Sequence, residues 1–384
     1  MRVLIVADTL TNRPANPFVL QLIESLVGLP LIRHVSYGVR LFFWQRSAFD
    51  VIHFQWPEVL FDWTVPTTEQ LNEFAARLAA YKQTAAVVTT IHNLDPHPPL
   101  RESGEMIFER VYSATDAFIH LSDGAKNLFI EKYGDRSWCR FAPHHVLEHG
   151  DYVHYTRLPE DDSLVRSARK TSDTRLLLVF GALRSVEEEE MARTAFQQAA
   201  VENSKLVFAG NPVTTTLPPG TLKAWRENID PNIVRHHMRI PDEQVAPLVK
   251  ASRFLFIPRT GRINSGVIPL AFTFGTPVIA PDEALSSAVR AVGGSTYIPG
   301  DSQSAAAAIR TAFAMGDAAY GELRERIRAY RKQRMQWAAI GRQHEQIYAE
   351  TLRSHPGRRP IARLCQLLGK RRGRADLPKK PARS

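Results

Sequence analysis

This 384-residue sequence has little cysteine and lacks any long apolar run. Its two cysteines, Cys139 and Cys365, lie far apart and in no spacing typical of zinc or redox sites, so we expect neither a disulfide framework nor a bound metal. No stretch of about eighteen apolar residues predicts a membrane span, and the apolar segment at residues 1–8 is too short for a secretory signal. We therefore predict a cytoplasmic protein.

Positive charge is concentrated at the carboxyl-terminal end. The net charge is +10, yet residues 355–384 contain ten Lys or Arg and one acid, which leaves 39 bases and 38 acids elsewhere. A nucleic-acid-binding fold should carry a basic face of its own, so we expect no nucleic-acid partner. Residues 360–372 place apolar side chains on one helical face between basic ones. This basic tail predicts a segment lying on an anionic inner membrane surface, the alternative being a solvated, disordered tail.

The chain is long enough for two domains, because single cores stop growing at roughly 250 to 300 residues. Apolar strands alternate with helical stretches in both halves, which predicts an α/β protein with two Rossmann-like, doubly wound domains. We place the amino-terminal domain at residues 1–158 and the carboxyl-terminal domain at residues 172–335. A terminal helix at residues 336–354 and the basic tail at residues 355–384 complete the chain.

The expected elements follow from apolar runs bounded by turn or helix signals. Strands of the first half are expected near residues 1–8, 50–57, 85–93, 116–123 and 139–146, with helices near residues 17–28, 67–81 and 102–114. Strands of the second half are expected near residues 175–184, 204–211, 232–240, 252–259, 276–282 and 294–300, with helices near residues 187–202, 241–251, 266–274 and 302–315. Residues 320–352 form a last helix-rich segment.

Residues 262–282 contain the clearest chemical motif. A strand ends, a polar loop follows, and Ser265 and Gly266 begin a helix. Free amides at a helix amino terminus attract anions, and a glycine lets a phosphate approach the backbone. Arg259 and Arg262 add fixed positive charge. The segment predicts a diphosphate site, the alternative being a helix capped by Ser265 with solvated arginines.

The same segment resembles the donor-site motif of GT-B fold glycosyltransferases in the broad group around glycosyltransferase family 4. In that group a Gly-led helix precedes a G-x-P-V-I strand, which here occupies residues 275–279. Further pieces agree in order, and the similarity covers roughly residues 1–350. These pieces are FQWPE at residues 54–58, TIHNLDPH at residues 90–97, HGDY at residues 149–152, GALRS at residues 181–185, FAGN at residues 208–211 and the segment around Trp337.

The resemblance implies a GT-B fold whose two domains face a central cleft, the carboxyl-terminal one holding a nucleotide diphosphate sugar and the amino-terminal one an acceptor. It implies transfer of the sugar to a lipid-linked glycan in cell-surface or exopolysaccharide synthesis, with retention of configuration, no metal and no other cofactor. The tail would make the enzyme peripheral on the inner face of the plasma membrane. Expected donor-binding residues are Gly181, Arg184, Gly210, Asn211, Arg239, Ile240, Arg259, Arg262, Asn264, Ser265 and Gly266.

Catalytic and acceptor residues are expected in the amino-terminal domain. The imidazole of His92 follows a strand and has a pKa suited to proton transfer, and Asp95 could act as a base. His97 stands among prolines and is interpreted as an ordinary loop residue. The catalytic candidates are His92, Asn93 and Asp95, and the acceptor candidates are Asp8, Thr9, Asn16, Trp56, whose ring could stack on a sugar, and Glu58.

Three positions depart from the family pattern. Glu187 stands where the family has a lysine that helps to hold the diphosphate, and Arg259 or Arg262 could replace it. The two glutamates of the family's donor motif fall at Ile263 and Leu270. Two alternatives therefore stay open. One is a GT-B epimerase or an inverting transferase, and the other is a weakened GT-B protein that assists an active transferase at the membrane.

Overall fold

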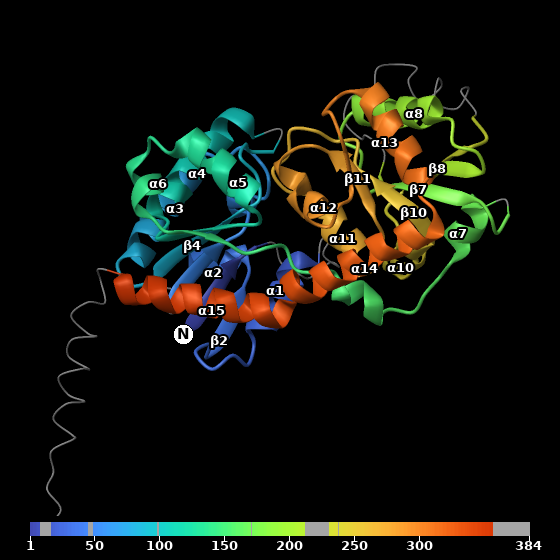
Figure 1. Ribbon diagram of the computed structural model, residues 1–384. Helices are drawn as coiled ribbons and strands as arrows, with labels where there is room; N and C mark the ends of the chain where they lie inside the picture. Colours follow the sequence, from blue (N-terminus) through green and yellow to red (C-terminus); the bar gives the residue numbers. More distant parts are fainter. Residues whose placement is uncertain are drawn as a thin grey trace, which may run out of the picture.

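The structure, a computed structural model, describes residues 1–7, 17–44, 49–97, 100–169, 171–211, 230–236 and 238–355. The predicted acceptor residues Asp8, Thr9 and Asn16 lie outside the described residues, as does the basic tail beyond His355. Two α/β domains stand side by side, one built from each half of the chain (Figure 1).

The amino-terminal domain has a six-stranded parallel sheet in the order β2-β1-β3-β4-β5-β6. Every residue of β3, β4 and β5 is buried, as expected for parallel strands covered by helices on both faces. The strands are β1 (Arg2–Val6), β2 (His34–Tyr37), β3 (Val51–Phe54), β4 (Ala86–Ile91), β5 (Ala117–His120) and β6 (His144–Val146). The helices are α1 (Phe18–Leu26), α2 (Val39–Trp44), η1 (Pro57–Phe61), α3 (Thr68–Lys82), α4 (Arg101–Ala114), α5 (Asp123–Tyr133) and α6 (Ser137–Phe141).

The carboxyl-terminal domain has a second six-stranded parallel sheet, in the order β12-β11-β10-β7-β8-β9. Its strands are β7 (Arg175–Phe180), β8 (Ser204–Ala209), β9 (Ile233–His236), β10 (Ser252–Phe256), β11 (Val278–Pro281) and β12 (Ser295–Tyr297). The helices from the linker onward are η2 (Val153–Arg157), α7 (Ser163–Ala168), α8 (Val186–Ala199), α10 (Asp242–Ala251), α11 (Val267–Thr273), η3 (Ala284–Ser286), α12 (Ser287–Ala291), α13 (Ser302–Phe313), α14 (Asp317–Arg334) and α15 (Trp337–Ser354).

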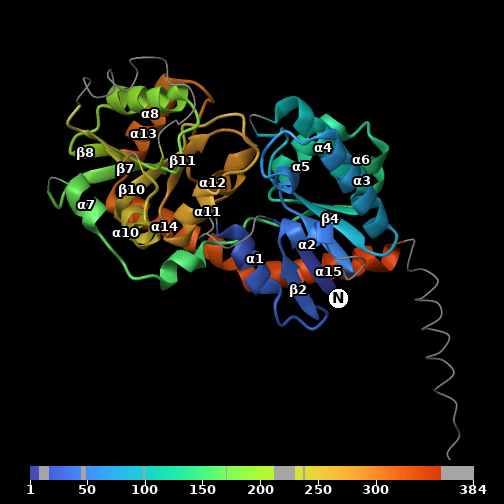
Figure 2. The same cartoon turned by 180° about the vertical axis from the view of Figure 1, so that it is seen from behind.

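The last helix, α15, crosses back from the carboxyl-terminal domain and lies along the amino-terminal sheet (Figures 1 and 2). Its Trp337, Ile340 and Tyr348 are buried in the same core cluster as β1 and α1. The crossing with α1 is close, since a Cβ at Gly341 would lie 2.3 Å from the carbonyl oxygen of Ser25. The amino-terminal domain is therefore completed by the end of the chain.

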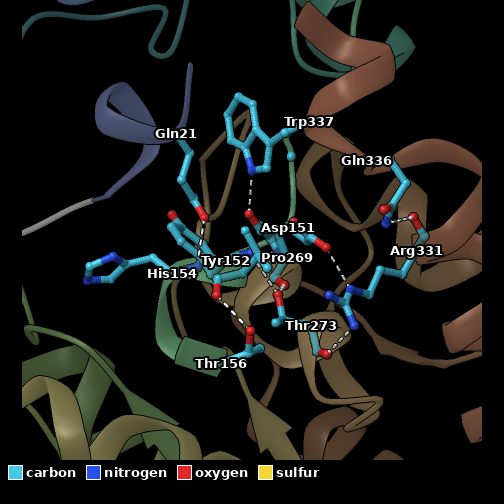
Figure 3. A network of polar contacts seen from close by, with 12 residues as sticks. Gln21, Asp151, Tyr152, His154, Thr156, Pro269, Thr273, Arg331, Gln336 and Trp337 are labelled. Atoms are coloured by element: carbon cyan, nitrogen blue, oxygen red, sulfur yellow. Dashed lines mark hydrogen bonds and ion pairs between the residues drawn. The ribbon is translucent and has the colours of Figure 1, made fainter. Parts of the chain in front are cut away.

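The linker between the domains is fixed by a network of polar contacts (Figure 3). Arg331 on α14 donates from Nε to Oδ2 of Asp151 at 2.7 Å, and Trp337 Nε1 donates to the Asp151 carbonyl at 2.6 Å. The Tyr152 amide donates to Thr273 Oγ1 at the end of α11, at 2.8 Å. The linker is thus tied to both domains at once.

The predicted fold class is confirmed, although several elements differ. The strand expected at residues 139–146 begins only at His144, because Ser137–Phe141 forms α6. The edge strand β2 and the helices α2 and α5 were not predicted, since their short or mixed segments lack a clear apolar period. The last helix-rich segment divides at residues 335–336 into α14 and α15.

Candidate active site

A cleft of about 280 Å³ lies between the two domains. Its amino-terminal wall includes Asn93 and His97, which follow the carboxyl end of β4. The facing wall is formed by the loops after β7 and β10 and by the start of α11. Parallel strands bring these loops to one edge of each sheet, and the two edges meet at the cleft. The predicted donor residues that line it are Gly181, Arg184, Arg259, Arg262, Asn264, Ser265 and Gly266.

Three arginines gather on the carboxyl-terminal wall. Arg259 is paired, because its Nε lies 2.7 Å from Oε1 of Glu188 and its Nη2 lies 3.0 Å from Oε2. Within the described residues, the guanidinium groups of Arg184 and Arg262 form no ion pair at hydrogen-bond distance, although the Glu188 carboxylate that binds Arg259 also acts on Arg184. Partial desolvation lowers the pKa of Arg184, and the charges of Arg259 and Arg262 lower it further. The wall therefore carries positive charge that an anion would neutralise.

Two glycines shape this wall. Gly181, at the end of β7, has a φ of 96°, which other residues rarely adopt. A Cβ at Gly266 would lie 2.8 Å from Tyr152 Oη, so glycine is needed where this hydroxyl meets the backbone. Gly210 serves the fold instead, since a Cβ there would lie 2.1 Å from the Gly181 carbonyl oxygen. Gly210 is not among the residues that line the cleft, and its donor contact stays a prediction.

Three more predicted donor residues lie outside the cleft. Asn211 is exposed, and its carbonyl accepts the amide of Leu183 at 3.1 Å. Arg239 is directed toward Asp242, with 3.4 Å between Nη2 and Oδ1. Ile240 is 5% exposed and belongs to the core of its own domain. Their donor contacts stay predictions.

The start of α11 combines a local polar contact with an apolar wall. Ser265 Oγ accepts the amide of Val267 at 3.3 Å, but the N-cap residue is Gly266 and no side chain caps the helix. One turn further, Leu270 lines the cleft and is 3% exposed. A ligand at this point meets a hydrocarbon side chain where the family motif has a glutamate.

The loop before α11 docks on the amino-terminal domain. Asn264 donates from Nδ2 to the carbonyls of Ile91 and His92, at 3.2 and 3.1 Å. Ile263, at the other glutamate position of the family motif, is 5% exposed and packs in the amino-terminal core. This loop therefore joins the two domains across the cleft, and the Asn264 amide group is already engaged.

His92 is close to the cleft but turned away from its lining. Its Nε2 donates to Oε1 of Gln55 at 2.9 Å, and its ring stacks on Trp56 with centroids 3.9 Å apart. Burial holds the pKa of His92 well below its usual range, with smaller effects from His149 and His97. His92 is therefore a neutral imidazole that donates one hydrogen bond.

A buried polar chain continues behind His92. Gln55 Nε2 lies 3.1 Å from His53 Nε2, and Thr90 Oγ1 lies 2.8 Å from the same nitrogen. His53 Nδ1 lies 2.7 Å from the hydroxyl of Tyr348 on α15. Burial lowers the pKa of His53 well below its usual range. The terminal helix thus supports the polar groups that orient His92.

Three predicted residues of the amino-terminal domain have other partners. Asp95 is 74% exposed and pairs with Lys132 Nζ at 2.6 Å, outside the cleft lining. Trp56 uses its ring face for His92. Glu58 is fully buried, and its Oε1 lies 3.0 Å from His97 Nδ1. The catalytic role of Asp95 and the acceptor roles of Trp56 and Glu58 stay predictions, while Asn93 lines the cleft.

Sequence reasoning missed four residues that line the cleft: His97, Tyr152, Tyr155 and Glu188. His97 and Tyr152 belong to the TIHNLDPH and HGDY segments, so the family order contained a signal for them. Tyr155 follows Tyr152 on the same linker turn, and Glu188 belongs to a run of glutamates at a helix start. Only their tertiary contacts distinguish these two from ordinary structural residues.

His120 and His144 form a hydrogen-bonded pair of histidines away from the cleft lining. His144 Nδ1 lies 2.8 Å from His120 Nε2, and its Nε2 donates to the Cys139 carbonyl at 2.8 Å. Burial lowers the pKa of His120 to about 3. In the part of the chain that the structure describes, no group of three or more His, Cys, Asp or Glu side chains could hold a metal ion. No helix of that part is both long and apolar enough to cross a membrane.

Two parallel α/β domains, a cleft between their strand ends and a terminal helix that crosses back together define the GT-B fold. No family model matches the sequence. The chain is 23% identical over 281 residues to the GDP-mannose:glycolipid 4-beta-D-mannosyltransferase of Xanthomonas campestris pv. campestris, across 72% of this chain and 73% of that protein.

Solved structures share the whole fold. Sucrose-phosphate synthase from Thermosynechococcus elongatus matches with a TM-score of 0.67 and 16% identity, over 91% of this chain and 98% of that one. Anabaena HepE in complex with UDP and glucose matches with a TM-score of 0.62 and 14% identity, over 91% and 100%. The resemblance to GT-B fold glycosyltransferases is confirmed, and the chain is a glycosyltransferase of this fold.

Proposed function

We propose that this enzyme transfers a sugar from a nucleoside diphosphate sugar to a lipid-linked glycan. The observation that carries the proposal is the pair of guanidinium groups, Arg184 and Arg262, that line the cleft and form no ion pair at hydrogen-bond distance among the described residues. A diphosphate leaving group gains negative charge as its bond to the sugar breaks, and fixed cations aimed at that charge stabilise the transition state. Guanidinium groups suit this role, since they bind phosphate oxygens bidentately.

The comparisons support a nucleotide donor and a lipid acceptor. The relative from Xanthomonas is named for GDP-mannose and a glycolipid, and HepE was solved with UDP and glucose. We extend both features to this chain as a GDP- or UDP-activated hexose and a glycan on a lipid carrier. Such an acceptor places the enzyme at the cytoplasmic face of the membrane, where the basic tail contacts anionic lipid. The reaction would belong to cell-surface or exopolysaccharide synthesis.

The chemistry needs no metal in this proposal, because the arginines supply the positive charge that a divalent cation provides elsewhere. Arg184 and Arg262 hold the diphosphate, while Arg259 shapes the wall through its pair with Glu188. The family resemblance implies retention of configuration. We propose the inverting alternative instead, because inversion needs a base for the acceptor hydroxyl and His97 gives this chain a candidate on the amino-terminal wall.

Thermal shift with UDP-glucose, GDP-mannose, UDP and GDP tests donor binding directly. A ligand at a hundredfold excess over its dissociation constant stabilises the folded state by about 2.7 kcal/mol. Replacing Arg184 or Arg262 by alanine removes a charge-assisted contact of about 1.5 to 3 kcal/mol and should weaken binding by roughly 10- to 150-fold. Arg310→Ala, an exposed site on α13, is the matched control.

The alternative of a weakened GT-B protein that assists another transferase rests on Ile263 and Leu270, which replace the glutamates of the family motif. A protein of that kind should not be stabilised by any of the four nucleotides. That result would overturn the proposal, and so would equal binding by the wild type and both arginine variants.

A further inference from the structure

His97 is held against a buried carboxylate at the edge of the cleft. Glu58 is 0% exposed, and its Oε1 lies 3.0 Å from His97 Nδ1 and 3.2 Å from the His97 backbone amide. The His97 side chain is 18% exposed and lines the cleft. A carboxylate can only accept hydrogen bonds, so Nδ1 carries the proton and Nε2 keeps its lone pair.

The turn that holds Glu58 is strained. Asp62 and Trp63, directly after η1, have φ angles of 51° and 59°, a left-handed conformation that is unfavourable for residues other than glycine. The Trp63 amide donates to the Glu58 carbonyl at 3.2 Å, and its indole meets the His97 ring edge-to-face at 5.3 Å. The turn therefore places a carboxylate on one side of the imidazole and an aromatic ring on another. Strain of this kind is concentrated at functional sites.

Asn93 is the hydrogen-bond partner of His97 on the cleft side. Its Nδ2 lies 3.3 Å from both ring nitrogens of His97. Because Nδ1 gives its proton to Glu58, the Asn93 amide can donate only to the lone pair of Nε2. A hydroxyl in the cleft that donates to Nε2 would therefore replace this Asn93 contact.

His97 is better placed than His92 to meet a hydroxyl in the cleft, because its ring lines the cleft and that of His92 does not. Glu58 holds Nδ1 of His97 and so fixes Nε2 as the nitrogen that can accept a proton. His92 instead has an uncharged amide partner, Gln55, and its burial opposes protonation. Among the described residues that line the cleft, the one carboxylate is Glu188, which is bound to Arg259. This comparison leaves His97 as the base.

We propose that His97 is the catalytic base of the transfer and that Glu58 is its positioning residue, an inference that rests on the function proposed above. His97 Nε2 takes the proton of the acceptor hydroxyl while the oxygen forms a bond to the anomeric carbon. The bond from that carbon to the diphosphate oxygen breaks, and its electron pair leaves with the diphosphate toward Arg184 and Arg262. Base and arginines line opposite walls of the cleft, as an in-line displacement requires, so the product has the inverted configuration.

The test compares His97→Asn with wild type in the full chain, with GDP-mannose and UDP-glucose as donors and with water, octyl glucoside and octyl mannoside as acceptors. We expect kcat to fall by about 10²- to 10⁴-fold while the donor Kd stays within twofold. His34→Asn, on the exposed edge strand β2, controls for histidine loss and should keep wild-type rates. Proton NMR of the wild-type product should show the anomer opposite to that of the donor.

The role of Glu58 has to be tested by a measurement that a purely structural role would leave unchanged. Glu58→Gln should lower kcat with little change in KM, and Glu58→Asp should recover part of the loss because it restores the charge. Removing one partner of a buried pair can prevent folding. The double variant His97→Asn with Glu58→Gln removes both the base and the buried charge, and should fold, bind donor and remain inactive.

Two results would overturn the assignment of His97 and Glu58 as a catalytic pair, called the dyad below. One is a kcat within threefold of wild type for folded His97→Asn or for the double variant, and the other is a product with the configuration of the donor. If wild type transfers no sugar from any donor, the proposed function fails and the dyad fails with it. If wild type transfers sugar and the variants do so equally well, only the dyad fails.

Discussion

The loop that carries Asn264 yields a quantitative prediction about how the two domains are held together. Asn264→Ala removes both hydrogen bonds from Nδ2 to the carbonyls of Ile91 and His92. Because these bonds cross the cleft, their loss should favour separation of the domains without unfolding either one. Ile263 would still pack in the amino-terminal core, so the contact is weakened rather than lost.

The size of the effect follows from two neutral hydrogen bonds. Each hydrogen bond contributes about 1 kcal/mol net, so the loss of both changes the free-energy difference between joined and separated domains by about 2 kcal/mol. This corresponds to roughly a thirtyfold change in the ratio of molecules with joined domains to molecules with separated domains. If transfer needs both walls of the cleft, kcat should fall by up to that factor. The donor Kd should change little, because the arginines that bind diphosphate in our proposal all belong to one domain.

Small-angle scattering and steady-state kinetics measure the two consequences separately. Asn264→Ala should have a larger radius of gyration than wild type, and Ile263→Ala should enlarge it further, since emptying a buried isoleucine site costs about 2–5 kcal/mol. Asn72→Ala, exposed on α3, is the matched control. An unchanged radius together with an unchanged kcat in Asn264→Ala would refute the view that this loop joins the domains.

Two further predictions concern stability. Burial lowers the pKa of His120 to about 3 and that of His344 to about 4, whereas both titrate near 6.5 once unfolded, so the unfolded chain binds more protons between those values. The stabilising contribution of the two neutral histidines should therefore be fully present above about pH 6.5. Below that pH the free energy of unfolding should decline by about 1.4 kcal/mol per pH unit for each histidine. Equal urea midpoints at pH 7 and pH 5 would contradict this. Gly341→Ala should cost about 1–3 kcal/mol, because its Cβ would meet the Ser25 carbonyl oxygen at 2.3 Å. Gly321→Ala on α14 has open space around it and should gain about 1 kcal/mol, so a similar melting temperature for the two variants would count against the close helix crossing.

Much of the fold was predictable because buried parallel strands appear in the sequence as continuous runs of apolar residues. Residues 86–91 and 175–180 both show this pattern and form strands next to the cleft. The gathering of Arg184, Arg259 and Arg262 was also predictable, since the carboxyl ends of parallel strands meet at one edge. Short elements without an apolar period, such as the edge strand β2, were beyond this reasoning.

The partners within the site were not predictable, because they join residues far apart in the chain. Glu58 and His97 are separated by 39 positions, and Asn264 and Ile91 by 173. From the sequence alone, His92 was the predicted catalytic histidine. The structure shows that its ring stacks on Trp56 and does not line the cleft. Pairing of this kind depends on tertiary packing, which local sequence patterns do not describe.

The crossing of α15 also affects how the chain can be synthesised. Domains generally fold as they emerge from the ribosome, the amino-terminal one first. Here the amino-terminal core includes Trp337, Ile340 and Tyr348, which are translated only after the whole carboxyl-terminal sheet. The first half of the chain must therefore wait with an uncovered apolar face until the second half has been made, a period in which it depends on chaperones or on its own solubility.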